Sequence, residues 1–170
     1  LAPVLAERAE VCEQLRRIPD ETIDDFKRTG LFRAFVAPEF GGYGLEIATV
    51  VETSREVAKA CGSSGWCLAI CTLHNHIASE YPREVQAQVF GSNPDAVVCG
   101  VFMPAGQVIP VEGGYRFSGS WDFASTSDHS DYAVLAGLEF KDAESRTRGD
   151  APPRGVANCL LPRSDYALED

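Results

Sequence analysis

The stretch NPDAVVCGVF, residues 93–102, is where the pattern of apolar residues changes from helical to extended. Asn93-Pro94 is a turn signal, and the apolar run that follows, residues 96–102, is typical of a buried strand. Before this point apolar residues recur at helical spacing, and after it short extended runs alternate with turns. Helices followed by strands predict an α+β fold, with an all-α helical domain over residues 1–94 and an antiparallel, barrel-like β domain over residues 95–170.

The N-terminal part predicts helices with one apolar face. Pro19 and Asp20 suit the start of a helix and Gly30 suits the residue just after its end. The expected helices cover residues 3–17, 19–30, 46–61, 66–81 and 82–91. The helix over 66–81 is almost entirely apolar, so we expect it at the centre of a bundle.

The C-terminal part predicts strands. Gly113-Gly114 separates two extended runs and predicts a hairpin whose turn needs a positive φ. The expected strands cover residues 96–102, 107–111, 115–119, 132–138 and 156–161. The polar stretch over 139–155 predicts a mobile surface loop.

Composition excludes several classes of function. The formal net charge of -10 disfavours binding to nucleic acid, which needs clustered cations. Apolar runs stop well short of the roughly 20 residues of a membrane span, and no GxGxxG motif follows a strand to mark a Rossmann nucleotide site. Six cysteines without a CxxC pair predict buried, reduced thiols in a cytoplasmic protein.

Two local patterns invite a catalytic reading that the rest of the sequence does not support. Cys67, Cys71 and His74 would share one helix face, as metal ligands do, but no fourth ligand is evident, so we expect no metal. The GSSG run at 62–65 does not match the GxSxG motif of hydrolases, and its serines suit the cap of the helix starting at Trp66.

The segment GSWDFASTSDHSDY, residues 119–132, combines an aromatic side chain with many hydroxyls. It has two readings, because Trp121 could lie in the core with hydroxyls capping the local backbone, or the segment could contact a ligand. Trp66 and His74 share a face of the helix over 66–81, about 12 Å apart along its axis. Burying His74 is costly without a partner, so it is either a hydrogen-bonded core residue or a proton-transfer group. We assign no role to His129.

Two longer motifs carry a family resemblance. The stretch IPDETIDDFKRTGLFRAFVAPEFGGYGLEI, residues 18–47, is similar to the N-terminal helical segment of the acyl-CoA dehydrogenase superfamily. The stretch VEGGYRFSGSWDFAST, residues 111–126, resembles that superfamily's β-domain hairpin and the flavin-lining segment after it. Where the dehydrogenases carry Thr-Glu-Pro-Gly and Trp-Ile-Thr type segments, this chain has GVFMPAGQV and SWDFAST. These segments, with GSSGWCLAICTLHNH at 62–76, resemble the reduced-flavin-dependent, two-component aromatic monooxygenases, such as the phenolic-steroid and hydroxyphenylacetate hydroxylases.

This resemblance implies a reaction and its partners. Reduced FMN or FAD, supplied by a separate flavin reductase, would react with O2, and the resulting C4a-hydroperoxyflavin would hydroxylate a phenolic substrate, such as a steroid-derived phenol, in aromatic catabolism. Water has to be excluded, because a leaking site releases hydrogen peroxide instead. The resemblance also implies a cytoplasmic homotetramer.

The resemblance assigns the site residues as well. Catalysis falls to His74, on the substrate side, and to Ser125, which with Thr126 would lie near the N5 and C4 edge of the flavin. Trp121 would form an aromatic wall for the isoalloxazine ring. The implied flavin contacts are Trp66, Phe102, Trp121, Phe123, Ser125 and Thr126.

Members of the superfamily continue into a C-terminal four-helix bundle that completes the flavin site. We therefore expect this chain to be the N-terminal part of a longer protein and to be inactive alone. Two alternatives stay open: an acyl-CoA dehydrogenase with tightly bound FAD, and a non-catalytic module of the same fold. A carboxylate base further along the chain would favour the dehydrogenase. A second histidine in the pocket would favour the oxygenase.

Overall fold

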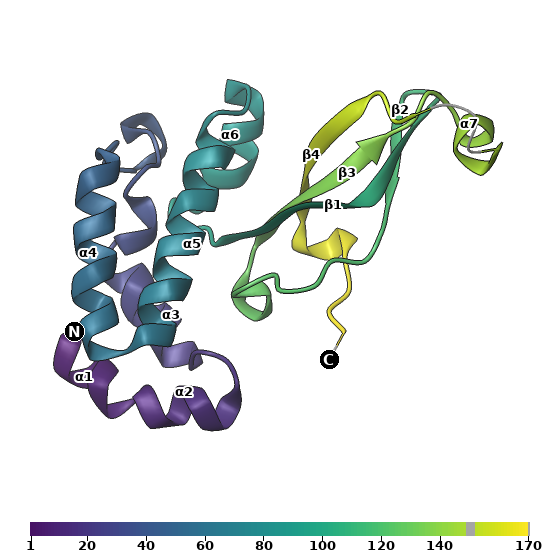
Figure 1. Ribbon diagram of the computed structural model, residues 1–170. Coiled ribbons are helices and arrows are strands. Elements are labelled where there is room, and N and C mark those ends of the chain that lie inside the picture. The colour runs from purple at the N-terminus through teal and green to yellow at the C-terminus, as the bar shows by residue number, and fades with distance from the viewer. Residues whose placement is uncertain (149–151, 170) are drawn as a thin grey trace.

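The computed structural model describes residues 1–148 and 152–169. Helices make up the N-terminal half and a curled sheet lies beside them (Figure 1). The helices are α1 (Ala2–Glu7), α2 (Ala9–Leu15), α3 (Asp20–Arg28), α4 (Ile47–Ala60), α5 (Gly62–Ser79), α6 (Arg83–Phe90) and α7 (Ala143–Arg148), with 3-10 turns η1 (Leu31–Arg33), η2 (Pro38–Phe40), η3 (Ser127–His129) and η4 (Arg163–Asp165). The strands are β1 (Val98–Val111), β2 (Gly114–Ser118), β3 (Tyr132–Glu139) and β4 (Gly155–Pro162). The predicted α+β class is confirmed.

Helix α5 is central, because it contacts α2, α4, α6, η1 and β1. The single helix predicted over 3–17 is wrong, since it breaks at Arg8 into α1 and α2. The Arg8 guanidinium lies 2.8 Å from Asp25 and 3.3 Å from the Thr22 hydroxyl, both on α3. This contact between helices leaves no trace in the local apolar spacing. No helix among the described residues is long and apolar enough to cross a membrane.

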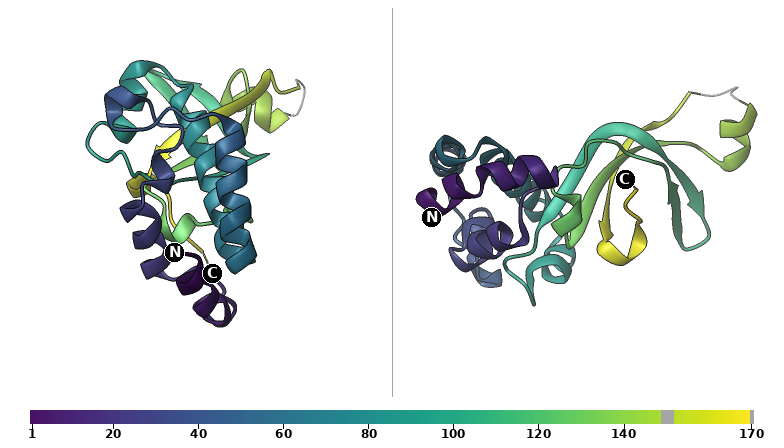
Figure 2. Two further views of the ribbon diagram at one scale, coloured as in Figure 1. Left: turned by 90° about the vertical axis from the view of Figure 1, so that its left-hand side faces the viewer. Right: turned by 90° about the horizontal axis from the view of Figure 1, so that it is seen from below.

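The sheet is mixed, with the strand order β2-β1-β3-β4, and it curls when viewed from below (Figure 2). The expectation of a wholly antiparallel sheet is wrong at one pair, because β1 and β3 run parallel, starting at Val98 opposite Tyr132. The chain between β2 and β3 returns to the end where β1 begins, and parallel pairing requires such a return. The two strands predicted over 96–102 and 107–111 are one strand, β1, with a register shift between Val101 and Gly106. Pro104, which has no N–H, lies within that shift.

The surface loop predicted over 139–155 contains helix α7. The Ser145 backbone N–H donates to the Asp142 carboxylate at 2.6 Å, a local bond of the kind that starts a helix. Residues 149–151 of that prediction lie outside the described residues.

Asn75 on α5 joins the two halves of the molecule. Its buried amide nitrogen donates to the carbonyl oxygens of Phe32 and Ala96, at 3.0 and 2.9 Å, and its oxygen accepts from the Val98 N–H at 3.2 Å. These bonds link η1, α5 and the start of β1. The Arg33 guanidinium reinforces the link with two bonds to the Asp95 carboxylate.

Trp121 lies against the sheet, in a space left by glycines. Its ring packs on Phe117 with centroids 4.9 Å apart, and its indole N–H donates to the Ala136 carbonyl at 2.8 Å. A Cβ added at Gly106 would come within 2.2 Å of the indole, and one at Gly119 within 2.8 Å. The absence of side chains at these positions therefore makes room for the indole.

We expect Gly106→Ala to lower the free energy of unfolding by about 2 kcal/mol, because the added methyl overpacks the Trp121 contact. Urea unfolding followed by circular dichroism measures the loss. Gly155→Ala on β4 is the matched control, since its Cβ would meet no atom within 4 Å. Equal stability of the two variants would contradict this account of the packing.

Candidate active site

A groove of about 760 Å³ lies between the helices and the segment that precedes β3. Its walls come from residues 12–18, from the first turns of α5 over 62–67, and from residues 123–129. This volume is within the range of roughly 300–1,000 Å³ for small-molecule sites. The groove therefore brings together the N-terminal part of α5 and the polar segment that the sequence singled out.

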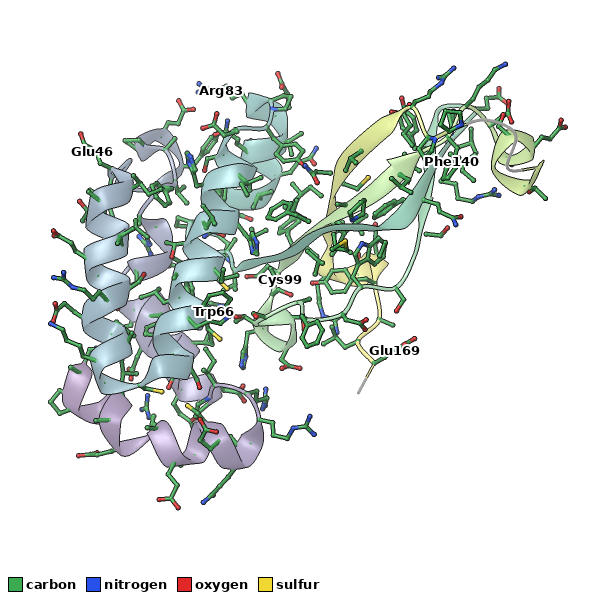
Figure 3. The ribbon with its side chains drawn as sticks, in the orientation of Figure 1. Glu46, Trp66, Arg83, Cys99, Phe140 and Glu169 are labelled. Atoms are coloured by element: carbon green, nitrogen blue, oxygen red, sulfur yellow. The ribbon has the colours of Figure 1, made fainter. Side chains whose placement is uncertain are left out.

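A hydrogen bond joins these two walls. The Trp66 indole N–H donates to the Ser125 hydroxyl oxygen at 3.1 Å, across 59 positions of sequence. Figure 3 shows Trp66 on the side of α5 that faces this segment. A hydroxyl that accepts one bond keeps its own proton to donate and a second lone pair.

Two aromatic side chains in the groove are exposed. Trp66 is 59% exposed and Phe123 is 97% exposed. Two exposed aromatic side chains beside one groove form a small apolar surface that fits the docking of an apolar, planar group.

The backbone around Ser125 is strained. Phe123 and Thr126 have φ values of 62° and 70°, in the left-handed region that residues other than glycine rarely adopt. The Ser125 N–H donates to the Phe123 carbonyl at 2.9 Å, which closes a tight turn. The Thr126 hydroxyl oxygen is buried and faces the Cys67 and Cys71 thiols. Such strain at the wall of a groove is typical of a functional segment.

His129 anchors this segment to the helices, a contact that sequence reasoning missed. Its Nε2 lies 2.9 Å from the Ile18 carbonyl oxygen and its Nδ1 lies 3.4 Å from the Asp20 carboxylate. The first of these contacts spans 111 positions of sequence. No local pattern signals such a contact, so its role emerges only from the tertiary structure.

His74 lies away from the groove, buried between α5 and β1. Its ring contacts the Phe102 ring edge-to-face, with centroids 5.4 Å apart, and a Cβ added at Gly100 would lie 3.1 Å from its Nε2. Its Nδ1 is buried without a hydrogen-bond partner among the described residues. Burial lowers the pKa of the His74 imidazole, and the neighbouring Val98 backbone only partly opposes this. The imidazole is therefore neutral at neutral pH.

We expect the folded protein to lose stability as the pH falls below 6.5, the ordinary pKa of histidine. Because the folded state lowers the pKa of His74, the unfolded chain binds the proton more readily over this range, and acid favours unfolding. The contribution of His74 is fully present above pH 6.5 and is lost as the pH falls through its folded-state pKa. Urea midpoints between about pH 5 and 8 measure this loss. His74→Gln should reduce it, whereas His76→Gln, on the same helix, should retain it.

The remaining predicted contacts are dispersed. Phe102 is 43% exposed at the irregular part of β1, beside His74. Trp121 packs against the sheet and is not among the residues that line the groove. The groove thus unites Trp66, Phe123, Ser125 and Thr126, while His74, Phe102 and Trp121 lie outside it.

The described residues contain no group of three or more His, Cys, Asp or Glu side chains placed to hold a metal ion. Cys71 is fully buried, and burial raises the pKa of its thiol to about 12, which disfavours the thiolate that a metal needs.

The groove has features that fit a flavin. The faces of Trp66 and Phe123 suit a planar ring system, and the Ser125 and Thr126 hydroxyls suit its polar edge.

The chain is similar to several known proteins. The chain is 35% identical over its full length to the flavin-dependent monooxygenase, oxygenase subunit HsaA, of Rhodococcus jostii. It is 34% identical over its full length to the oxygenase component of an FADH2-dependent resorcinol hydroxylase of Rhizobium. Among solved structures it resembles XiaF from Streptomyces in complex with FADH2 and glycerol, with a TM-score of 0.90 and 32% identity over 99% of this chain.

The chain spans only 42%, 40% and 41% of the lengths of these three proteins. The sequence-family model for the acyl-CoA dehydrogenase N-terminal domain matches residues 1–89, which is more than half of the 170 residues. The protein therefore belongs to the family of acyl-CoA dehydrogenase N-terminal domains.

Proposed function

We propose that this chain is the helical and β-sheet part of a flavin-dependent monooxygenase that uses reduced FMN or FAD and O2 to hydroxylate a phenolic substrate. The observation that carries the proposal is the Trp66–Ser125 hydrogen bond, which fastens two distant segments into one groove with exposed aromatic faces. The similarity to an oxygenase subunit and to the oxygenase component of an FADH2-dependent hydroxylase supports the same reaction class.

In this proposal the groove holds the flavin. Trp66 and Phe123 would pack against its ring, and Ser125, held in place by Trp66, would use its second lone pair to accept a hydrogen bond from the flavin N5–H. Thr126 bonds to the neighbouring polar edge. The reduced flavin supplies the electrons and the site of reaction with oxygen, while the protein excludes water.

The proposal gives His74 the substrate-side proton transfer. A neutral imidazole can accept a phenolic proton, and the exposed Phe102 ring beside it offers an apolar contact for an aromatic substrate. Trp121 contributes by supporting the sheet below the flavin-contacting segment, through its bond to Ala136.

The partners follow from the same reaction class. A separate reductase would deliver reduced flavin, as the term oxygenase component implies for the Rhizobium relative. We also propose a homo-oligomer, a tetramer in the complete protein, in the cytoplasm. We further propose that the helical domain covers residues 1–94 and the β domain residues 95–170, and the change from helix α6 to strand β1 supports this division.

Anaerobic mixing of the full-length protein with reduced flavin, followed by oxygen, tests the function. We expect a transient absorbance that neither reduced nor oxidised free flavin shows, and a hydroxylated product when a phenol is present. Direct bleaching of bound FAD by an acyl-CoA would instead indicate a dehydrogenase. Failure to bind either form of flavin would indicate a non-catalytic module.

A further inference from the structure

Cys12 and Cys61 form a close pair of thiols in the helical half. Their sulfurs lie 3.8 Å apart across 49 positions of sequence, and neither is in a disulfide. Cys12 lies on α2, and Cys61 is the N-cap residue of α5. A disulfide needs a separation of about 2 Å, so a small movement of α2 toward α5 would bring the sulfurs into bonding distance.

The surroundings of Cys61 favour its thiolate. The Ser64 hydroxyl donates to its sulfur at 3.2 Å, and the N-terminus of the 18-residue helix α5 stabilises negative charge there. Burial raises the pKa of the Cys61 thiol, but hydrogen bonds from Ser64, Ser63 and Cys12 outweigh it, and the pKa is lowered. Burial and the contact with Cys61 raise the pKa of Cys12 to about 11, so Cys12 remains a protonated thiol.

A small reagent can approach the pair from the groove. Cys12 is one of the residues that line the groove, next to Ser63 and Trp66. Cys12 and Cys61 are only 3% and 5% exposed, so a reagent has to be small to reach either sulfur. Hydrogen peroxide is small enough for this route, and bulkier oxidants are not.

We propose that Cys61 and Cys12 are a peroxide-reactive site that closes to a disulfide. The Cys61 thiolate attacks one oxygen of hydrogen peroxide, so that an S–O bond forms, the O–O bond breaks and hydroxide leaves, which takes up the proton that the Cys61 thiol lost on ionising. Cys61 is thereby oxidised by two electrons to a sulfenic acid. The Cys12 sulfur then attacks the Cys61 sulfur, the S–O bond breaks, and the departing hydroxide takes up the Cys12 proton. Two thiols and one peroxide give one disulfide and two waters.

This site goes beyond the proposed hydroxylation, which needs neither thiol. The thiol site is nevertheless connected to the proposed hydroxylation, since an oxygenase that leaks would release hydrogen peroxide into the groove that Cys12 lines. The chemistry of the pair is nevertheless testable without flavin, so its outcome is independent of the proposed function.

The test is peroxide treatment of the full-length protein without flavin, followed by blocking of the remaining thiols, digestion and mass spectrometry. We expect a cross-linked peptide pair containing Cys12 and Cys61 that a reducing agent separates. Cys159, the half-buried thiol on β4, should react at least about tenfold more slowly than Cys61. Oxidation of Cys159 as fast as Cys61, or no cross-link, would overturn the proposal.

Two variants separate the steps. Cys12→Ser should leave a sulfenic acid on Cys61 that dimedone traps, because the second thiol is missing. Cys61→Ser keeps a favourable N-cap residue for α5, and Cys12 should then stay unoxidised. If Cys12 is oxidised equally with and without Cys61, then Cys61 is not the sulfur that peroxide attacks, and the proposal is overturned. If Cys12→Ser fails to fold, the presence or absence of the Cys12–Cys61 cross-link in the unmodified protein still tests the proposal.

Discussion

Asn75→Leu should lower the free energy of unfolding by about 3–5 kcal/mol. The two side chains are similar in volume, so the substitution removes hydrogen bonds without opening a large cavity. It leaves the Phe32 and Ala96 carbonyls and the Val98 N–H buried without their present partner. Each such group costs about 1–3 kcal/mol when it is left unsatisfied.

Chemical unfolding followed by circular dichroism measures this effect. Asn158→Leu is the matched control, because Asn158 is an exposed residue on β4. We expect the control to change stability by less than about 1 kcal/mol. Similar losses in both variants would show that Asn75 does not join the helices to the sheet in the way the bond lengths indicate.

Ser125→Ala should reduce the hydroxylated product formed per reduced flavin by about tenfold or more, with a matching rise in hydrogen peroxide. The substitution removes both the acceptor of the Trp66 indole N–H and the hydroxyl proposed to hold the flavin N5 proton. Loss of that proton favours release of peroxide over transfer of oxygen. Product and peroxide, measured in the same reaction with the full-length protein, give the coupling directly.

Ser125→Thr keeps a hydroxyl and should retain most of the coupling. Ser120→Ala, on an exposed residue of the same segment outside the groove, is the matched control and should behave like the unmodified protein. Uncoupling by Ser120→Ala to the same extent would point to a general loosening of the segment. Full coupling in Ser125→Ala would refute the role proposed for this hydroxyl.

The local parts of the fold were predictable from the sequence. Pro19 and Asp20 mark the start of α3, and Gly113 at the hairpin has the positive φ of 80° that the glycine pair predicted. The apolar helix α5 lies at the centre of the helical half, as its composition indicated. These features depend on residues a few positions apart, where backbone preference and apolar spacing are strong signals.

The errors share one cause, which is contact between residues far apart in sequence. The break at Arg8 accompanies its ion pair with Asp25, and the parallel pairing of β1 with β3 depends on the path of the chain between β2 and β3. The candidate site follows the same rule. The sequence pointed to Trp66 and Ser125 separately, but the hydrogen bond between them depends on how the two segments pack.

Chain order, helix spacing and turn residues were enough to establish a helical part followed by a sheet, and to select the segment around Ser125 as chemically unusual. Packing established the rest: that Trp66 meets Ser125 in the groove, that His129 fastens the segment to Ile18, and that Trp121 supports the sheet. The physical reason is that such contacts are selected by the shape and burial of the whole chain, on which local backbone preferences carry no information.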